Sequence, residues 1–267
     1  KVMLEGNWGD CDGYAGTNAD DSEWVVLDND YWYYTRYEKG KEYPIYCRKR
    51  ESLENPEEAM INVNDWAKGH DYFSLTILSV SPNNKFLAFG VDTLSRRIYT
   101  IKIKDLQTGE LLMDEIHGTE DAVAWANDNA TFLYTVKNEI TLLSEHIDRH
   151  KLGTLQTDYV RVYTEKDDSF YIGIGRSKSD KYIIIYNSST LISDYYILNA
   201  NDPVGKFRQF SPRETEHEYT IEHYNDKFYI VTNWNAMNFR LMETPENVTT
   251  KINWKEEIPH RKDVMVS

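Results

Sequence analysis

The sequence contains very little cysteine. Only Cys11 and Cys47 occur among its 267 residues, and they stand in unlike contexts. Two cysteines in a chain of this length provide neither a disulfide framework nor a zinc site. This usage fits a reducing compartment best, so we expect a cytoplasmic protein and keep the periplasm as the alternative.

Basic charge is in short supply as well. The chain has 30 Lys and Arg against 44 Asp and Glu, which gives a formal net charge of -14. A protein that binds nucleic acid needs a basic surface for the phosphates, so we expect no nucleic acid partner. An acidic surface attracts cationic peptides, although it is also the ordinary charge of many soluble proteins.

Long apolar runs are missing too. No stretch of about 18 apolar residues occurs, so we expect no membrane-spanning helix and no membrane partner. The first residue is Lys1 rather than Met, and no charged and then apolar leader follows it. We therefore expect a chain that was processed or cut from a longer protein.

Motifs of catalytic and metal sites are absent or incomplete. The nearest match to a nucleophile elbow, residues 175–179, ends in Ser instead of Gly and precedes an expected strand rather than a helix. Residues 10–13 are like the start of a calcium loop, but Gly is missing at the sixth position and Glu at the twelfth. His217 and His223 are separated by roughly 20 Å along a strand, too far to share a metal. We therefore expect no catalytic residue, no metal and no cofactor in this chain.

What the sequence has instead is a repeated strand signature. An Asn- or Asp-containing turn precedes an apolar, tyrosine-rich strand at five places, and these strands begin at Tyr31, Phe86, Phe132, Tyr182 and Phe228. The starting positions differ by 55, 46, 50 and 46 residues. A near-constant period of this size, filled with short strands, is typical of four-stranded propeller blades. We therefore predict an all-β fold, a β-propeller of four-stranded antiparallel blades with about five blades present.

The blades are predicted to form one domain that occupies residues 28–263. Residues 1–27 are rich in Gly and Asp without a clear period, so they are predicted to be irregular apart from a short strand at residues 24–27. Residues 264–267 are predicted to be the truncated start of the next blade. Five blades are expected to form an open arc whose uncovered edges allow self-association.

Two short segments after the first predicted hairpin differ from the strands around them. Residues 55–58 contain Pro and acidic side chains, so they are predicted to be a linker. Residues 64–69 are predicted to form a helical turn that Asn64 caps and Gly69 closes.

The second repeat is the part of the sequence that points most specifically to a known family. Its segments at residues 73–75, 80–85, 89–92 and 95–110 closely resemble the oligopeptidase B (protease II) group of the prolyl oligopeptidase family of serine peptidases. The resemblance covers roughly residues 28–263. It continues at residues 123–128, 149–154, 165–171, 217–219, 233–242 and 258–261.

The resemblance implies a seven-bladed propeller that is joined to an α/β-hydrolase domain. That domain would carry the catalytic Ser, Asp and His, and members of the family cleave short peptides after Arg or Lys. The propeller would restrict access to short peptides and dock the hydrolase domain. This chain resembles only the propeller, so the expected partners are the hydrolase domain of the same polypeptide and short basic peptides. The chain by itself is expected to be inactive.

Four residues are candidates for contacts at the domain interface or in the channel. Arg96 and Arg97 stand in a turn of the second repeat, where at least one of two adjacent arginines reaches a surface partner. Arginine suits a bidentate contact with a carboxylate, and a solvated basic turn is the plain alternative. His217 and Glu218 are expected at a blade end, where they would line the central channel.

Two other functions stay open. A stand-alone propeller that binds a protein or peptide is one, although the Trp-Asp dipeptide of the common propeller repeat is missing. A propeller glycosidase is the other, with paired carboxylates such as Asp92 and Asp167 or Glu218. It would need two carboxylates that face one pocket at about 5–9 Å, which the sequence does not show.

Overall fold

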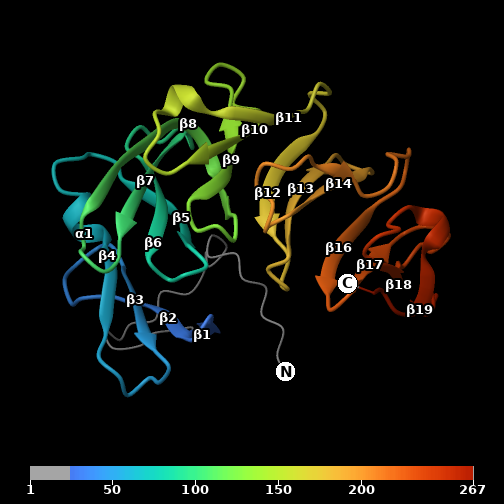
Figure 1. Cartoon of the computed structure of the whole chain (residues 1–267), viewed down its shortest axis with the longest axis horizontal. Coiled ribbons are helices and arrows are strands. Elements are labelled where there is room, and N and C mark those ends of the chain that lie inside the picture. Colours follow the sequence, from blue (N-terminus) through green and yellow to red (C-terminus); the bar gives the residue numbers. More distant parts are fainter. Residues whose placement is uncertain (1–24, 267) are drawn as a thin grey trace. The chain divides into compact units, whose positions relative to one another are not determined.

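The computed structural model describes residues 25–266, which form two compact units that divide between His117 and Gly118 (Figure 1). Regular structure in these residues is almost entirely antiparallel β-sheet, so the predicted all-β fold is confirmed. None of the helices in this part of the chain is long and apolar enough to cross a membrane. The predicted irregular segment lies outside the described residues up to position 24, as does the calcium-like sequence at residues 10–13.

The first unit contains two blades, and in each blade the strands pair in chain order. Blade 1 consists of β1 (Val25–Asp28), β2 (Tyr31–Arg36), β3 (Ile45–Arg50) and β4 (Glu58–Asn62), and the helical turn α1 (Val63–Trp66) follows it. Blade 2 consists of β5 (Ser74–Val80), β6 (Phe86–Asp92), β7 (Tyr99–Asp105) and the first part of β8 (Leu111–Trp125).

The second unit contains three blades with the same strand order. Blade 3 is formed by the second part of β8 with β9 (Thr131–Lys137), β10 (Ser144–Lys151) and β11 (Val160–Thr164), and the short helix η1 (Gln156–Asp158) precedes β11. Blade 4 consists of β12 (Tyr171–Arg176), β13 (Tyr182–Ser188), β14 (Ser193–Asn199) and β15 (Arg208–Gln209). Blade 5 consists of β16 (Tyr219–Tyr224), β17 (Lys227–Thr232), β18 (Arg240–Pro245) and β19 (Lys255–Ile258), with η2 (Lys251–Asn253) before β19.

Strand β8 differs from the sequence prediction of two separate strands. It has 15 residues and is the last strand of blade 2 and the first of blade 3, so β5 to β11 belong to one seven-stranded sheet. The division between the two units and an irregularity in the pairing both lie inside β8. Gly118 has a φ of 74°, and the pairing with β9 shifts register between Thr119 and Val123. An irregularity of this kind interrupts the pairing locally while the ladder continues on both sides.

Asn and Asp residues hold the left-handed backbone conformation in the turn between the first two strands of each blade. The φ angle is 66° at Asp30, 60° at Asn84, 59° at Asn129, 59° at Asp180 and 55° at Asn225. Asn and Asp adopt this conformation more readily than other residues with a side chain, and tight hairpins require it. The repeated turn in the sequence is therefore the same backbone feature in all five blades of the described residues.

Apolar side chains between neighbouring blades form the core. In the first unit, Leu87 and Phe89 of blade 2 pack with Tyr33 and Met60 of blade 1. In the second unit, one cluster joins blades 3 and 4, and another, which includes Phe228, joins blades 4 and 5. Burial of each such large side chain stabilises the fold by about 1.5–3 kcal/mol. Apolar packing therefore holds blades 1 and 2 together in the first unit, and blades 3, 4 and 5 in the second.

The segments after the first hairpin correct two predictions. Residue 58, assigned to a linker, begins β4, whose Met and Ile side chains complete the core face of blade 1. The helical turn α1 is capped by Asn62 rather than Asn64, because the Asn62 side chain accepts a hydrogen bond from the Asn64 N–H at 3.1 Å. The helix ends before Gly69, which has a φ of 82°.

The residues after β19 contain no strand as far as position 266. This segment contacts blade 5 at Asn238, whose carbonyl accepts from the Val266 N–H at 2.9 Å and whose side chain donates to the carbonyls of Arg261 at 3.1 Å and Lys262 at 2.9 Å. The domain limits at residues 28–263, the truncated next blade and the open arc stay predictions.

Candidate functional site: the polar contacts that join the blades and an acidic recess

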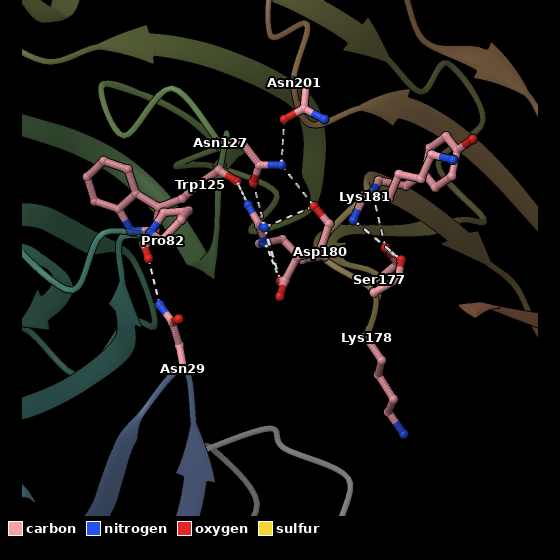
Figure 2. A network of polar contacts seen from close by, with 12 residues as sticks. Asn29, Pro82, Trp125, Asn127, Ser177, Lys178, Asp180, Lys181 and Asn201 are labelled. Carbon is pink, nitrogen blue, oxygen red and sulfur yellow. Dashed lines mark hydrogen bonds and ion pairs between the residues drawn. The ribbon is translucent and has the colours of Figure 1, made fainter. Parts of the chain in front are cut away.

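The turn between the first two strands of a blade, here called its first turn, also contacts the neighbouring blade. In the first unit, the Asn29 side chain donates to the Pro82 carbonyl at 2.6 Å (Figure 2), and the Asn84 side chain donates to the Asn29 carbonyl at 3.0 Å. The buried Arg48 guanidinium donates to the Asn84 carbonyl at 2.9 Å and pairs with Glu58 at 2.8 Å. The two first turns of this unit are therefore joined by side chains that bind backbone carbonyls.

Blades 3 and 4 are joined by Arg176 at the end of β12. Its guanidinium donates to the Trp125 carbonyl, to Asn127 Oδ1 at 2.8 Å and to Asp180 Oδ1 at 3.1 Å. Figure 2 shows Asn127 between the Asp180 carbonyl and Asn201, to which its amide donates at 3.2 and 3.0 Å. Arginine keeps its charge at any pH that the fold encounters. This junction is therefore insensitive to pH near neutrality.

Blades 4 and 5 are joined by a hydrogen-bonded chain through a histidine. Ser179 Oγ lies 2.7 Å from His223 Nδ1, and His223 Nε2 lies 3.0 Å from Glu246 Oε2. Lys181 Nζ contacts the same Glu246 oxygen at 2.5 Å. Hydrogen bonds to Lys181 and His223, opposed only by some burial, hold the pKa of the Glu246 carboxyl below its ordinary value. Glu246 is therefore ionised and accepts from both neighbours.

The direction of each hydrogen bond in this chain follows from Glu246. A carboxylate only accepts, so His223 Nε2 carries the proton and Nδ1 of the neutral ring is an acceptor. Ser179 must then donate to Nδ1, and Ser177, whose Oγ lies 2.9 Å from Ser179 Oγ, must donate to Ser179. The Tyr182 N–H completes the chain by donating to Ser177 Oγ at 3.1 Å. Burial lowers the pKa of His223, and the attraction of Glu246 offsets this only in part.

The order Ser179, His223, Glu246 is also the order of a nucleophile, its base and an orienting acid. The His223 side chain is 0% exposed, however, and Glu246 is shared with Lys181 and with the Tyr182 hydroxyl at 3.3 Å. A substrate cannot reach a ring that the two blades enclose. The chain therefore joins blades 4 and 5 and is not an accessible acyl-transfer site. No local sequence motif contains this group, because its partners lie 44 and 23 residues apart.

An acidic recess lies between the start of β10 and the loop that joins β11 to β12. Glu165 is fixed there by the Tyr163 hydroxyl at 2.8 Å and by Arg213 Nη2 at 2.6 Å, while Arg213 stacks over the Phe170 ring at 3.9 Å. Although burial opposes it, hydrogen bonds from Arg213 and from the Asp167 N–H hold the pKa of Glu165 below its ordinary value. The recess is lined by Leu143, Ser144, Glu145, Glu165, Lys166, Asp167, Asp168 and Phe170.

The turn between β6 and β7 carries two of the residues singled out in the sequence. The Asp92 carboxylate accepts backbone N–H groups from Leu94 at 2.8 Å, Arg96 at 2.9 Å and Arg97 at 2.8 Å. Arg96 and Arg97 are exposed on this turn. Asp92 is buried and fully engaged with the backbone, which removes it as a carboxylate of a glycosidase pair.

The other two candidates lie in blade 5 and have different surroundings. His217 is only 4% exposed, contacts Thr232 Oγ1 through Nε2 at 3.0 Å and stacks on Tyr219 with ring centres 4.9 Å apart. Burial lowers the pKa of His217, and the charge of Lys251 adds to this. Glu218 is half-buried, and its N–H donates to the Asn233 side chain at 3.0 Å. His217 is thus a core side chain, and the assignment of the four candidates to a channel or an interface stays a prediction.

Metal ligation has no support in the described part of the chain. Within residues 25–266, no three His, Cys, Asp or Glu side chains are grouped so that they could hold a metal ion. His217 and His223 occupy separate environments, one beside Thr232 and the other between Ser179 and Glu246.

Comparison with known proteins gives one consistent family. The family model described as the N-terminal β-propeller domain of prolyl oligopeptidase matches residues 15–267. The chain is 37% identical over 268 residues to dipeptidyl aminopeptidase BI of Pseudoxanthomonas mexicana, a match that covers 94% of this chain and 37% of that protein. It is 31% identical over 236 residues to Protease 2 of Moraxella lacunata, which covers 85% of this chain and 34% of that protein.

Solved structures agree with the sequence relatives. Oligopeptidase B from Leishmania major superimposes with a TM-score of 0.87 and 27% identity, over 94% of this chain and 36% of that one. Oligopeptidase B from Trypanosoma brucei superimposes with a TM-score of 0.84 and 25% identity. The chain therefore spans little more than a third of the length of the proteins that it matches.

Proposed function

The chain belongs to the prolyl oligopeptidase family, in which it is the non-catalytic N-terminal propeller domain, and we propose that it gates and docks the catalytic domain. In this family the same polypeptide carries the hydrolase domain. The proposal has two parts: the propeller holds the hydrolase domain, and it admits short peptides while it excludes folded proteins. The match of the propeller model to residues 15–267 is the observation that carries it.

We propose that the peptides carry a positive charge. The resemblance to oligopeptidase B implies cleavage after Arg or Lys. The 37% identical relative is named a dipeptidyl aminopeptidase, which favours a second class, peptides with a free terminal amine. The net charge of -14 and the carboxylates of the acidic recess support both, because guanidinium and ammonium groups are drawn to the same field.

Peptidase assays separate these possibilities. We would compare this chain with the polypeptide that contains it and the hydrolase domain, using a blocked fluorogenic peptide that ends in arginine and an unblocked dipeptide substrate. We expect hydrolysis by the longer polypeptide alone. Cleavage of the blocked peptide would support the endopeptidase class, and cleavage of the unblocked one alone would support the dipeptidyl class. Activity in this chain would contradict the proposal, and silence in both would favour a stand-alone binding propeller.

The acidic recess can be tested in the longer polypeptide. Asp168→Asn removes an exposed charge from the recess, and Asp226→Asn removes one from the first turn of blade 5. An exposed charge pair contributes about 0.2–1 kcal/mol, so we expect Asp168→Asn to raise KM for the arginine peptide by roughly 1.5–5-fold. Equal KM values in the two variants would contradict the proposal that the recess attracts the cationic peptide.

Docking can be tested at the turn between β6 and β7. We expect Arg96→Ala and Arg97→Ala to weaken binding of the separately produced hydrolase domain to this chain, since arginine forks suit carboxylates at an interface. Arg50→Ala is the matched control, because Arg50 is an exposed arginine of the same unit. Unchanged affinity in both turn variants, measured by calorimetry, would exclude this turn as the docking surface.

We propose a cytoplasmic location, supported by the buried free thiol of Cys47. Fractionation of the source cells would test this, and recovery of the protein from the periplasm would contradict it.

A further inference from the structure

The junction between blades 4 and 5 differs in its chemistry from the junctions between blades 1 and 2 and between blades 3 and 4. Arg48 and Arg176 serve the junctions between blades 1 and 2 and between blades 3 and 4. Between blades 4 and 5, Arg208 donates to the Glu246 carbonyl and to Thr249 Oγ1 at 2.7 Å, and His223 adds an imidazole that the other two junctions lack at this place. Histidine is the side chain whose charge changes between pH 5 and 8, whereas arginine stays charged. The junction between blades 4 and 5 is therefore the one of these three that has a titratable imidazole between the blades.

His223 is enclosed by groups from both blades. Its ring packs edge-on against Tyr182 and Phe228, with centres 4.9 and 4.8 Å apart. The charged and titratable groups that face it are Glu222 of β16, Glu246 after β18, Lys181 before β13 and Tyr182 of β13. Glu246 and Glu222 favour the protonated ring, while burial and Lys181 oppose it, and burial is the largest influence.

A second proton on His223 conflicts with the hydrogen-bond order of the junction. The proton must go to Nδ1, because Nε2 already donates to Glu246. Nδ1 then becomes a donor, so Ser179 has to turn from donor to acceptor and its own hydrogen loses the imidazole as a partner. The new charge also lies on a side chain that is 0% exposed. A buried charge with a disrupted hydrogen-bond set is costly compared with the same charge in water.

We propose that the contact between blades 4 and 5 is a pH-sensitive seam, closed while His223 is neutral and opened locally when His223 takes up a second proton. The seam consists of the first turn of blade 4, residues 177–181, with Glu222, His223 and Glu246 of blade 5. Opening separates these groups and admits water to the histidine, while the arginine junction between blades 3 and 4 stays closed. This inference does not rest on the proposed peptidase role.

The direction of the effect follows from proton linkage. The pKa of His223 is lowered in the closed seam and returns toward about 6.5 when the ring is hydrated. The stabilisation from the neutral ring is therefore complete above about pH 6.5 and is lost as the pH falls toward the lowered pKa. Between pH 7.5 and 5.5 the population of the open form rises by at most about tenfold, the limit for one proton with an open-state pKa of about 6.5.

Hydrogen exchange of this chain at pH 7.5 and 5.5, corrected for the intrinsic pH dependence, tests the seam. The reporting amides are those of Lys178 and His223, which donate to Glu222, and of Tyr182. The reference amide is that of Asn127, which donates to the Ala200 carbonyl between blades 3 and 4. We expect protection at the seam to fall by up to about tenfold at pH 5.5, with little change at the reference.

Two variants and one titration make the result decisive. His223→Gln keeps a donor and an acceptor but cannot titrate, so the pH response should vanish. His146→Gln changes a half-exposed histidine of β10, so the response should persist. A proton NMR titration of the unmodified chain should place the His223 pKa below 6.5. This measurement needs no variant, so it remains valid even if a substituted chain fails to fold. Equal responses at both junctions, a response that survives His223→Gln, or a His223 pKa at or above 6.5 would overturn the proposal.

Discussion

Removal of the Arg176 side chain tests the argument that polar contacts at the first turns join the blades. The side chain is 18% exposed and its partners are the Trp125 carbonyl, Asn127 Oδ1 and Asp180. Asp180 is 70% exposed, so that ion pair contributes at most about 1 kcal/mol. The other two hydrogen bonds come from a charged donor and are worth about 1.5–3 kcal/mol each. Arg176→Ala should therefore lower the free energy of unfolding of the second unit by about 3–7 kcal/mol.

The assay is urea unfolding of this chain, followed by tryptophan fluorescence and by circular dichroism. Arg176→Lys keeps the charge but not the planar fork, so it should lose about half as much stability. Arg50→Ala is the control, because its side chain is 69% exposed and its ion pair with Glu51 should contribute less than about 1 kcal/mol. A loss for Arg176→Ala that is no greater than the loss for Arg50→Ala would refute the reasoning.

Three further changes have expected outcomes in the same unfolding assay. Gly90→Ala would place a Cβ 2.4 Å from the buried Ile77 Cδ1. This overpacking should lower the free energy of unfolding by about 1–3 kcal/mol, and an unchanged urea midpoint would contradict the prediction. Phe228→Ala empties the core between blades 4 and 5 and should cost about 3–5 kcal/mol, whereas a cost below about 1 kcal/mol would mean that the blades repack. Asn62→Ala removes the cap of α1 and should lower the free energy of unfolding by about 1 kcal/mol. Asn64→Ala is the comparison, because Asn64 is the cap that the sequence predicted.

The sequence predicted the strands well because each blade repeats the same local signals. An Asn or Asp in the left-handed conformation, followed by an apolar strand, marks the first hairpin of every blade, and these positions are Asp30, Asn84, Asn129, Asp180 and Asn225. Those signals depend on backbone sterics and on alternation along a strand, so a short window contains them.

The errors occurred where a local signal was misleading. Strand β4 follows an Asn-Pro-Glu sequence that is typical of a linker, but Met60 and Ile61 are buried against blade 2. In β8 the apolar pattern is interrupted between Met113 and Ala122, yet the strand continues because its ladder partners change from β7 to β9. Tertiary pairing overrides local preference in such segments.

The polar contacts between blades could not be found from local patterns, since their partners are distant in the chain. Trp125 and Arg176 are 51 residues apart, Asn127 and Asp180 are 53 apart, and Ser179 and His223 are 44 apart. These separations are close to the 46–55 residues between successive strand starts. The polar partners are thus related by the repeat of the fold and not by a local motif.

Pairing of strands only with their neighbours in the chain has a consequence for how the molecule is made. In every described sheet the strand order is the order of synthesis, so no ladder has to wait for a distant segment. Contacts between two blades require only that one further repeat has been synthesised. Low separation of contacting residues favours rapid folding, and repeat arrays gain stability unit by unit. Each blade can therefore pair its strands soon after they leave the ribosome, and it buries its apolar face when the next blade packs on it.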